Sequence, residues 1–163
     1  MPVSHKSTAI DAWEALFRAE VSVLRFLNSE FPTGDISFNE YDVLFNLSRQ
    51  PGRRLRIRDL NRHLLLTQPS VSRLVDRLTQ SGHVYKESDA EDGRGTVVCL
   101  TDKGYESFRR VAVLHAESIN NHVGSALDTD ELLQLTALCN KLRLGAAGTG
   151  EATRPRARAA AKA

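Results

Sequence analysis

The chain has 163 residues, of which 41% are hydrophobic and 26% are charged, a composition typical of one globular domain. No apolar stretch approaches the roughly 20 residues that a membrane helix needs, and the N-terminal residues lack the apolar core of a secretion signal. We therefore expect a cytoplasmic protein. Its two cysteines, Cys99 and Cys139, do not have metal-binding spacing, and we expect neither a disulfide nor a cofactor.

The net charge of +2 conceals an uneven distribution. Residues 49–86 contain nine Lys or Arg and two Asp, a net charge of +7, whereas residues 1–48 are net acidic. A concentrated basic block is typical of a protein that binds a polyanion, and a solvated arginine-rich surface is the alternative. The block makes nucleic acid a candidate partner.

Two helices are predicted at the beginning of the chain. Between residues 8 and 31, apolar residues recur every three or four positions and form two stripes. A helix that is apolar on more than one side must be buried on more than one side, so we expect a partner subunit to cover it. A second helix is predicted over residues 38–48, with Ser37 as its N-cap and Glu40 completing a capping box.

A helix-turn-helix motif is predicted next. After a short strand at residues 55–57, a compact third helix is expected to end near Leu66. A fourth helix follows almost at once, over residues 67–81. Two short helices with a tight link, the second more polar on its outer face, are typical of this motif.

One face of the fourth helix is apolar and the others are polar. Its apolar side chains follow the spacing of a single helical face: Val71, Leu74, Val75 and Leu78. We expect the Thr67 side chain to cap the first turn, and Pro69 lies where a missing N–H costs little. Gly82 ends the helix.

A β-hairpin is predicted directly after this helix. Residues 84–87 and 96–100 have strand character, and the polar residues between them include two glycines. A hairpin in this position is the wing of a winged helix.

Two more helices are predicted in the last third of the chain. The first begins near Asp102 and carries a nearly heptad apolar stripe as far as Ala126. The second begins at a capping pair, Asp128 and Glu131, and is expected to end at Gly145.

Four segments together resemble one known family. The sequence LLLTQPSVSRLVDRL at residues 64–78 is followed by DAEDGR at residues 89–94 and VCLTDKG at residues 98–104. With YDVL at residues 41–44, these segments resemble the MarR family of bacterial transcriptional regulators, in the same element order over about residues 8–144. The resemblance implies a dimeric winged helix-turn-helix repressor, often released from DNA by a small molecule.

The predicted fold class is mainly α with a small β-hairpin wing, a winged helix-turn-helix plus a helical dimerisation region. The expected parts are an N-terminal dimerisation helix at residues 1–37, a winged helix-turn-helix DNA-binding region at 38–104, C-terminal dimerisation helices at 105–144 and a flexible basic tail at 145–163. A dimer would hold its two reading helices about 34–36 Å apart, so we expect an inverted-repeat operator with half-sites about 10 base pairs apart.

The fourth helix and the wing supply the candidate DNA contacts. The major groove admits one α-helix, in which Gln pairs with adenine, Arg with guanine, and Ser with a base or a phosphate. The candidates are Thr67, Gln68, Pro69, Ser70, Ser72, Arg73, Arg77 and Arg94. For the helix residues, ordinary helix-start polarity and a solvated face are the alternative interpretations. For Arg94 the alternative is an ordinary turn, in which Asp and Gly are present for backbone reasons.

The resemblance places effectors where the winged domain meets the dimerisation helices. Candidate pocket residues, which would suit a small aromatic or phenolic acid, are Trp13, Phe17, Phe38, Tyr41 and His115. Ordinary core packing is the alternative for these aromatic residues. His115 and His122 lie seven positions apart but lack a third metal ligand, and a redox role for Cys99 or Cys139 requires an accessible thiol.

Other classes of protein fit the sequence less well. No Ser-His-Asp arrangement, Gly-rich phosphate loop or paired carboxylate stands out, so we do not expect an enzyme. A winged-helix protein-interaction module without specific DNA binding remains an alternative, as does a metal- or redox-responsive regulator.

Arg94 gives a first test. It lies two residues after Asp92 at the tip of the wing, and the resemblance implies that Asp92 holds it in position. An arginine in a narrow minor groove meets an enhanced negative potential. We expect Arg94→Ala to lower operator affinity without unfolding the protein, and unchanged binding in a gel-shift titration would contradict this role.

Overall fold

The computed structural model describes residues 5–32, 34, 36–64, 66–90, 93 and 95–150, with side chains as far as residue 145. The chain forms two compact units, the first reaching to Asn120 and the second beginning at Asn121. Among the residues described, no helix is both long enough and apolar enough to cross a membrane.

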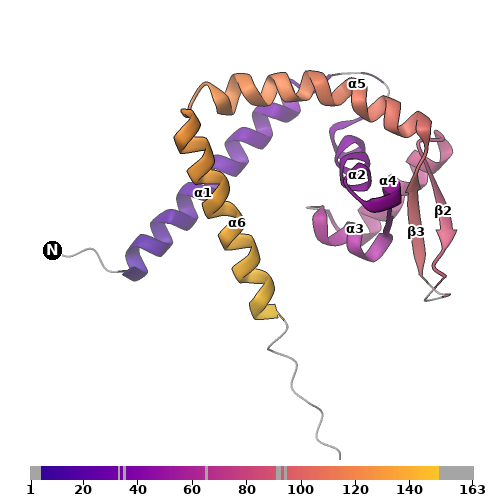
Figure 1. Cartoon of the computed structure of the whole chain (residues 1–163), viewed down its shortest axis with the longest axis horizontal. Coiled ribbons are helices and arrows are strands. Elements are labelled where there is room, and N and C mark those ends of the chain that lie inside the picture. The colour runs from indigo at the N-terminus through magenta and orange to yellow at the C-terminus, as the bar shows by residue number, and fades with distance from the viewer. Residues whose placement is uncertain are drawn as a thin grey trace, which may run out of the picture. The chain divides into compact units, whose positions relative to one another are not determined.

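The first unit contains most of the secondary structure (Figure 1). Its elements are α1 (His5–Ser29), α2 (Phe38–Ser48), the 3-10 turn η1 (Pro51–Arg53), β1 (Arg54–Arg56), α3 (Ile57–His63), α4 (Gln68–Gln80), β2 (Val84–Ser88), β3 (Thr96–Leu100) and α5 (Asp102–Ile119). A π-helical turn, η2 (Asn120–Gly124), and α6 (Thr129–Gly150) follow. This architecture confirms the predicted fold class, mainly α with a small wing.

The three strands form one antiparallel sheet in the order β1-β3-β2. Val98 at the centre of β3 pairs with Leu55 on β1 and with Lys86 on β2. The predicted hairpin is therefore confirmed, and β1 extends it to three strands. The predicted first strand is shifted by one residue, because Ile57 is already the first residue of α3.

The core of the first unit lies where α2, α3 and α4 pack against the sheet. All four residues of the predicted apolar face of α4 are buried there: Val71, Leu74, Val75 and Leu78. Figure 1 shows α5 passing over α2 in the same unit. Because one face of α4 lies in this core, its remaining faces form its outer surface.

The ends of α4 agree with the sequence in part. Thr67 is the N-cap residue, but the prediction that its side chain caps the helix is wrong, because it makes no capping hydrogen bond. Instead its hydroxyl lies 2.9 Å from the hydroxyl of Ser70. Pro69 has no N–H to offer at this end. Gly82 follows the C-cap with a φ of +74°, a conformation that favours glycine.

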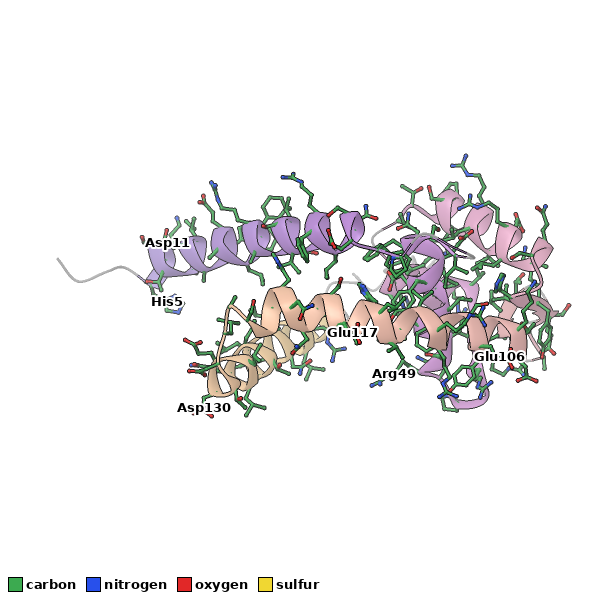
Figure 2. All side chains as sticks on the ribbon, turned by 90° about the horizontal axis from the view of Figure 1, so that it is seen from above. His5, Asp11, Arg49, Glu106, Glu117 and Asp130 are labelled. Carbon is green, nitrogen blue, oxygen red and sulfur yellow. The ribbon has the colours of Figure 1, made fainter. Side chains whose placement is uncertain are left out.

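The helix α1 is longer at its beginning and shorter at its end than predicted. It begins at His5 and ends at Ser29, and Leu27 is its one buried residue. In Figure 2 the labelled His5 and Asp11 mark its N-terminal end, where side chains project outward. Its apolar stripes are consequently largely exposed in the single chain.

The last two helices depart from the prediction at their C-terminal ends. The α-helix of α5 ends at Ile119 and gives way to η2, instead of continuing to Ala126. The predicted end of the final helix at Gly145 is also wrong, since α6 continues to Gly150. Two alanines after Gly145 are the strongest helix formers and favour this extension. Residues 151–163 of the expected tail lie outside the described residues.

Gly104 provides a test of the packing between α5 and the turn before β2. A Cβ atom at this position would lie 2.0 Å from the backbone oxygen of His83. We expect Gly104→Ala to destabilise the protein by about 3 kcal/mol, because backbone must move to admit the methyl group. Urea unfolding followed by circular dichroism measures this difference.

Gly145→Ala is the matched control, because nothing lies within 4 Å of the added Cβ. We expect this variant to be as stable as the parent, or up to about 1 kcal/mol more stable through helix propensity. Equal effects of the two substitutions would contradict the close packing at Gly104.

Candidate nucleic-acid interface

The outer surface of α4 presents the polar residues that the sequence singled out. Thr67, Gln68, Pro69, Arg73 and Arg77 are exposed, and Ser70 and Ser72 are half-buried. The helix α4 and its N-cap residue therefore hold seven of the eight candidate DNA contacts. The eighth, Arg94, and its predicted partner Asp92 lie outside the described residues.

Arg73 lies along the leading half of α4. Its Nε donates to the backbone oxygen of Pro69, one turn earlier, at 3.3 Å. The bond uses one of the five guanidinium donors, so most of the fork can still bind a base edge or a phosphate. No carboxylate of the described part of the chain forms an ion pair with Arg73. Its positive charge is therefore not offset locally.

Arg77 and Asp76 make longer-range contacts from the same helix. Arg77 Nε lies 3.5 Å from Glu40 Oε1 on the first turn of α2. Asp76 forms an ion pair with Lys86 on β2. Lys86 compensates the negative charge of Asp76, which reduces its repulsion of a nearby phosphate.

The basic block is more strongly compensated than the sequence indicates. Within the described residues, most of its cations contact a carboxylate: Arg53 with Asp102, Arg54 with Glu87, Arg56 with Asp89, Arg58 and Arg62 with Asp59, Arg77 with Glu40, and Lys86 with Asp76. The net charge of +7 therefore overstates the positive surface. What distinguishes α4 is the combination of its exposed polar face with the uncompensated Arg73.

Two ion pairs at the root of the wing were not found from the sequence. Arg56 on β1 binds the buried carboxylate of Asp89 through Nε at 2.5 Å and Nη2 at 3.2 Å. The backbone N–H of Asp89 also donates to Gly95 O at 2.9 Å across the base of the loop. Arg54 forms a single, more exposed contact with Glu87, from Nη2 to Oε2 at 3.1 Å. Both pairs reach across β3, the central strand. The sequence signal that could have found them is the matching spacing of two residues, between Arg54 and Arg56 on one strand and between Glu87 and Asp89 at the end of the other.

Three of the five candidate pocket residues come together. The ring of His115 lies 5.7 Å from that of Phe38 and 5.0 Å from that of Tyr41. Phe31, which the sequence did not single out for this site, is 5.4 Å from the same imidazole. Trp13 and Phe17 stack on each other at 5.9 Å, with 62% and 51% of their surfaces exposed. They do not join the His115 cluster.

His115 is the polar member of this aromatic cluster. Only 7% of its surface is exposed, and its Nδ1 has no hydrogen-bond partner in the described structure. Burial lowers the pKa of His115 below its ordinary value, because the surrounding rings disfavour the charged imidazolium. The neutral form is therefore the stable one at neutral pH.

A cavity of about 320 Å³ lies on another side of α2. It is lined by Leu24, Asn28, Phe38, Asn39, Asp42, His63 and Leu66. Phe38 is the one pocket candidate that borders it. Burial raises the pKa of Asp42, because a buried site disfavours the charged carboxylate.

Metal and redox chemistry find little support in the described residues. No group of three or more His, Cys, Asp or Glu side chains there is arranged to hold a metal ion. Cys99 is buried, and burial raises the pKa of its thiol, which disfavours the reactive thiolate. The apolar neighbours of Cys139 in the sequence suggest a buried side chain. In the structure Cys139 is only half-buried.

A helix-turn-helix followed by a hairpin wing, with β1 as the third strand of the sheet, defines a winged helix-turn-helix protein. A model of the MarR family matches residues 34–95, which include α2, α3, α4 and β2. This part of the chain is therefore similar to the MarR family.

Named relatives agree with this assignment. The transcriptional regulator YkoM of Bacillus subtilis is 33% identical over 86 residues, which cover 53% of this chain and 55% of YkoM. The chain thus spans about half the length of this curated relative. Among solved structures, the MarR family regulator Sco3205 of Streptomyces coelicolor, in complex with DNA, is 26% identical with a TM-score of 0.69, covering 99% of this chain and 96% of its own. The PcaV regulator from the same organism, in complex with its natural ligand, is 25% identical with a TM-score of 0.60, covering 90% and 99%.

His115 predicts a pH dependence of stability. Because its pKa is lower in the folded protein than in the unfolded chain, the unfolded chain binds the proton first as the pH falls. The stability associated with neutral His115 is therefore lost below the ordinary histidine pKa of about 6.5. We expect the thermal midpoint of the parent to fall more steeply than that of His115→Phe between about pH 7.5 and about pH 5.5. Parallel pH profiles would contradict the burial of a neutral imidazole.

Proposed function

We propose that the chain is a dimeric, sequence-specific DNA-binding transcriptional regulator that acts in the cytoplasm as a repressor. The observation that carries this proposal is α4, with one face in the core and the candidate contacts on the other. The helix fits the major groove, where Gln68 and Arg73 can read base edges and Arg77 can bind a phosphate. The DNA complex of Sco3205 supports this use of the fold.

Dimerisation is proposed from the apolar surface of α1. In the single chain this helix exposes large apolar side chains, among them Ile10, Trp13 and Phe17. Exposed apolar residues repeated along a helix are typical of a surface that a partner covers. A second copy would supply a second reading helix, and the operator would then be an inverted repeat with half-sites about 10 base pairs apart.

The effector is proposed to be a small aromatic or phenolic molecule. Phe31, Phe38 and Tyr41 form an apolar wall around His115, whose Nδ1 is available for a hydrogen bond within the described structure. Pockets with aromatic walls and few polar groups suit such ligands. The complex of PcaV with its natural ligand supports ligand binding in a protein of this fold. Trp13 and Phe17 are assigned to the dimer surface in place of the pocket.

The wing is proposed to contact the minor groove through Arg94, supported by Asp92. The ion pair of Arg56 with Asp89 fixes the root of the loop that carries these two residues. A fixed root reduces the freedom that the wing loses when it binds.

Arg73→Ala tests the proposed function. We expect affinity for an operator, selected from random duplexes, to fall about tenfold or more, with relaxed preference at one base pair. Fluorescence anisotropy with the operator and a scrambled duplex, over a series of salt concentrations, gives the affinities and their salt slopes. Footprinting of the same complex reports the half-site spacing.

Arg49→Ala is the matched control. Arg49, labelled in Figure 2, is an exposed arginine at the end of α2 and forms no ion pair among the described residues. Its removal is expected to change affinity by no more than about twofold. Equal losses from both variants, or equal binding of operator and scrambled duplex, would contradict sequence-specific reading by α4.

A further inference from the structure

Glu40 connects the first turn of α2 with the DNA-facing helix. Its Oε2 accepts hydrogen bonds from the backbone N–H of Ser37 at 2.8 Å and from the Ser37 hydroxyl at 2.9 Å. Its Oε1 lies 3.5 Å from Nε of Arg77. The side chain of Glu40 is 17% exposed, whereas that of Arg77 is 59% exposed. A fixed, mostly buried carboxylate therefore contacts a largely exposed cation.

The capping box keeps this carboxylate in place. Ser37 is the N-cap of α2 and Glu40 is its N3 residue, and both reciprocal hydrogen bonds of the box are present. The shorter bond, from the backbone N–H of Ser37 to Oε2, is enough to hold the carboxylate with Oε1 toward α4. The capping box of α2 thus also holds Glu40 in contact with Arg77, 37 residues further along the chain.

The geometry of an arginine determines what this contact can do. A guanidinium is planar, and a contact at Nε leaves the two terminal nitrogens at the far end of the fork. A long exposed arginine loses much rotamer freedom when it binds a phosphate. A contact that restricts the side chain before binding reduces this loss.

We propose that Glu40 is a positioning residue that holds Arg77 ready to bind a DNA phosphate. The proposal rests on the proposed function, in which α4 faces DNA. Glu40 contributes little to stability through the pair itself, because an ion pair with so exposed a partner is weak. Its effect is on the direction of the Arg77 fork.

Repulsion between Glu40 and the phosphate acts in the opposite direction. Both oxygens of Glu40 already have partners, Ser37 and Arg77, which offset part of the negative charge. Water and salt around the exposed Arg77 screen the remainder. Positioning therefore outweighs repulsion, and the net effect of Glu40 is to strengthen binding.

A double-mutant cycle tests the proposal with Glu40→Gln, Arg77→Ala and the double variant. We expect Arg77→Ala to weaken operator binding about tenfold and to reduce the salt slope by about one, as the loss of one phosphate contact does. Glu40→Gln is expected to weaken binding about three- to tenfold in the parent and to have no further effect in Arg77→Ala. The cycle uses the full chain, with anisotropy at several salt concentrations.

Ser37→Ala separates positioning from helix capping. This variant removes the Ser37 hydroxyl but keeps the backbone N–H that holds Glu40. We expect it to lower the thermal midpoint while leaving operator affinity within about twofold and the salt slope unchanged. If Ser37→Ala weakens binding as much as Glu40→Gln does, the effect is structural and the proposal is overturned.

Three further results would also overturn the proposal. Tighter binding by Glu40→Gln would make Glu40 a competitor of the phosphate, and additive losses in the cycle would show that it does not act through Arg77. Unchanged binding by Arg77→Ala would show that Arg77 makes no phosphate contact. A loss of binding in Arg73→Ala would still support the proposed function in that case. Failure of the parent to bind duplex DNA would instead overturn the proposed function.

Discussion

Burial of one face of α4 is the constraint on which the rest of the structure depends. Val71 and Val75 have no exposed surface, and Leu74 and Leu78 have almost none. Turning the helix about its axis would bring these side chains into water at a cost of about 1.5–3 kcal/mol for each one. Their burial therefore fixes which side of α4 faces outward. Gln68 and Arg73 occupy that side because the core holds the other.

Backbone contacts at both ends of the wing-bearing segment complete this frame. The Thr101 hydroxyl donates to the backbone oxygens of Gly82 and His83, and it also accepts from Gly104 N–H. The beginning of α5 is thereby joined to the turn that follows α4. In the last turn of α4, at the same end, Arg77 is joined to α2 by Glu40. A shift of α2 or α5 would consequently move α4, which gives the proposed effector a physical route to the proposed DNA-binding helix.

Charge has different meanings in the sequence and in the folded chain. The basic block reads as one positive surface, but most of its arginines are paired with carboxylates. Exposed pairs of this kind contribute little stability, so their main effect is to set the direction of side chains and to limit non-specific attraction. Arg73, without such a partner among the described residues, keeps its charge for binding. In the proposed function, specificity depends on a few placed cations more than on net charge.

The sequence by itself determined the local elements and much of the proposed DNA-binding surface. Periodicity located the core face of α4, and capping chemistry located the beginnings of α2 and α6, because these signals act within a few residues of the chain. Only the tertiary structure decided which distant residues meet: Phe31 joined His115, Trp13 and Phe17 stayed apart from it, and Glu40 reached Arg77. Such contacts depend on how the helices pack, and a pattern within one helix does not specify its neighbour.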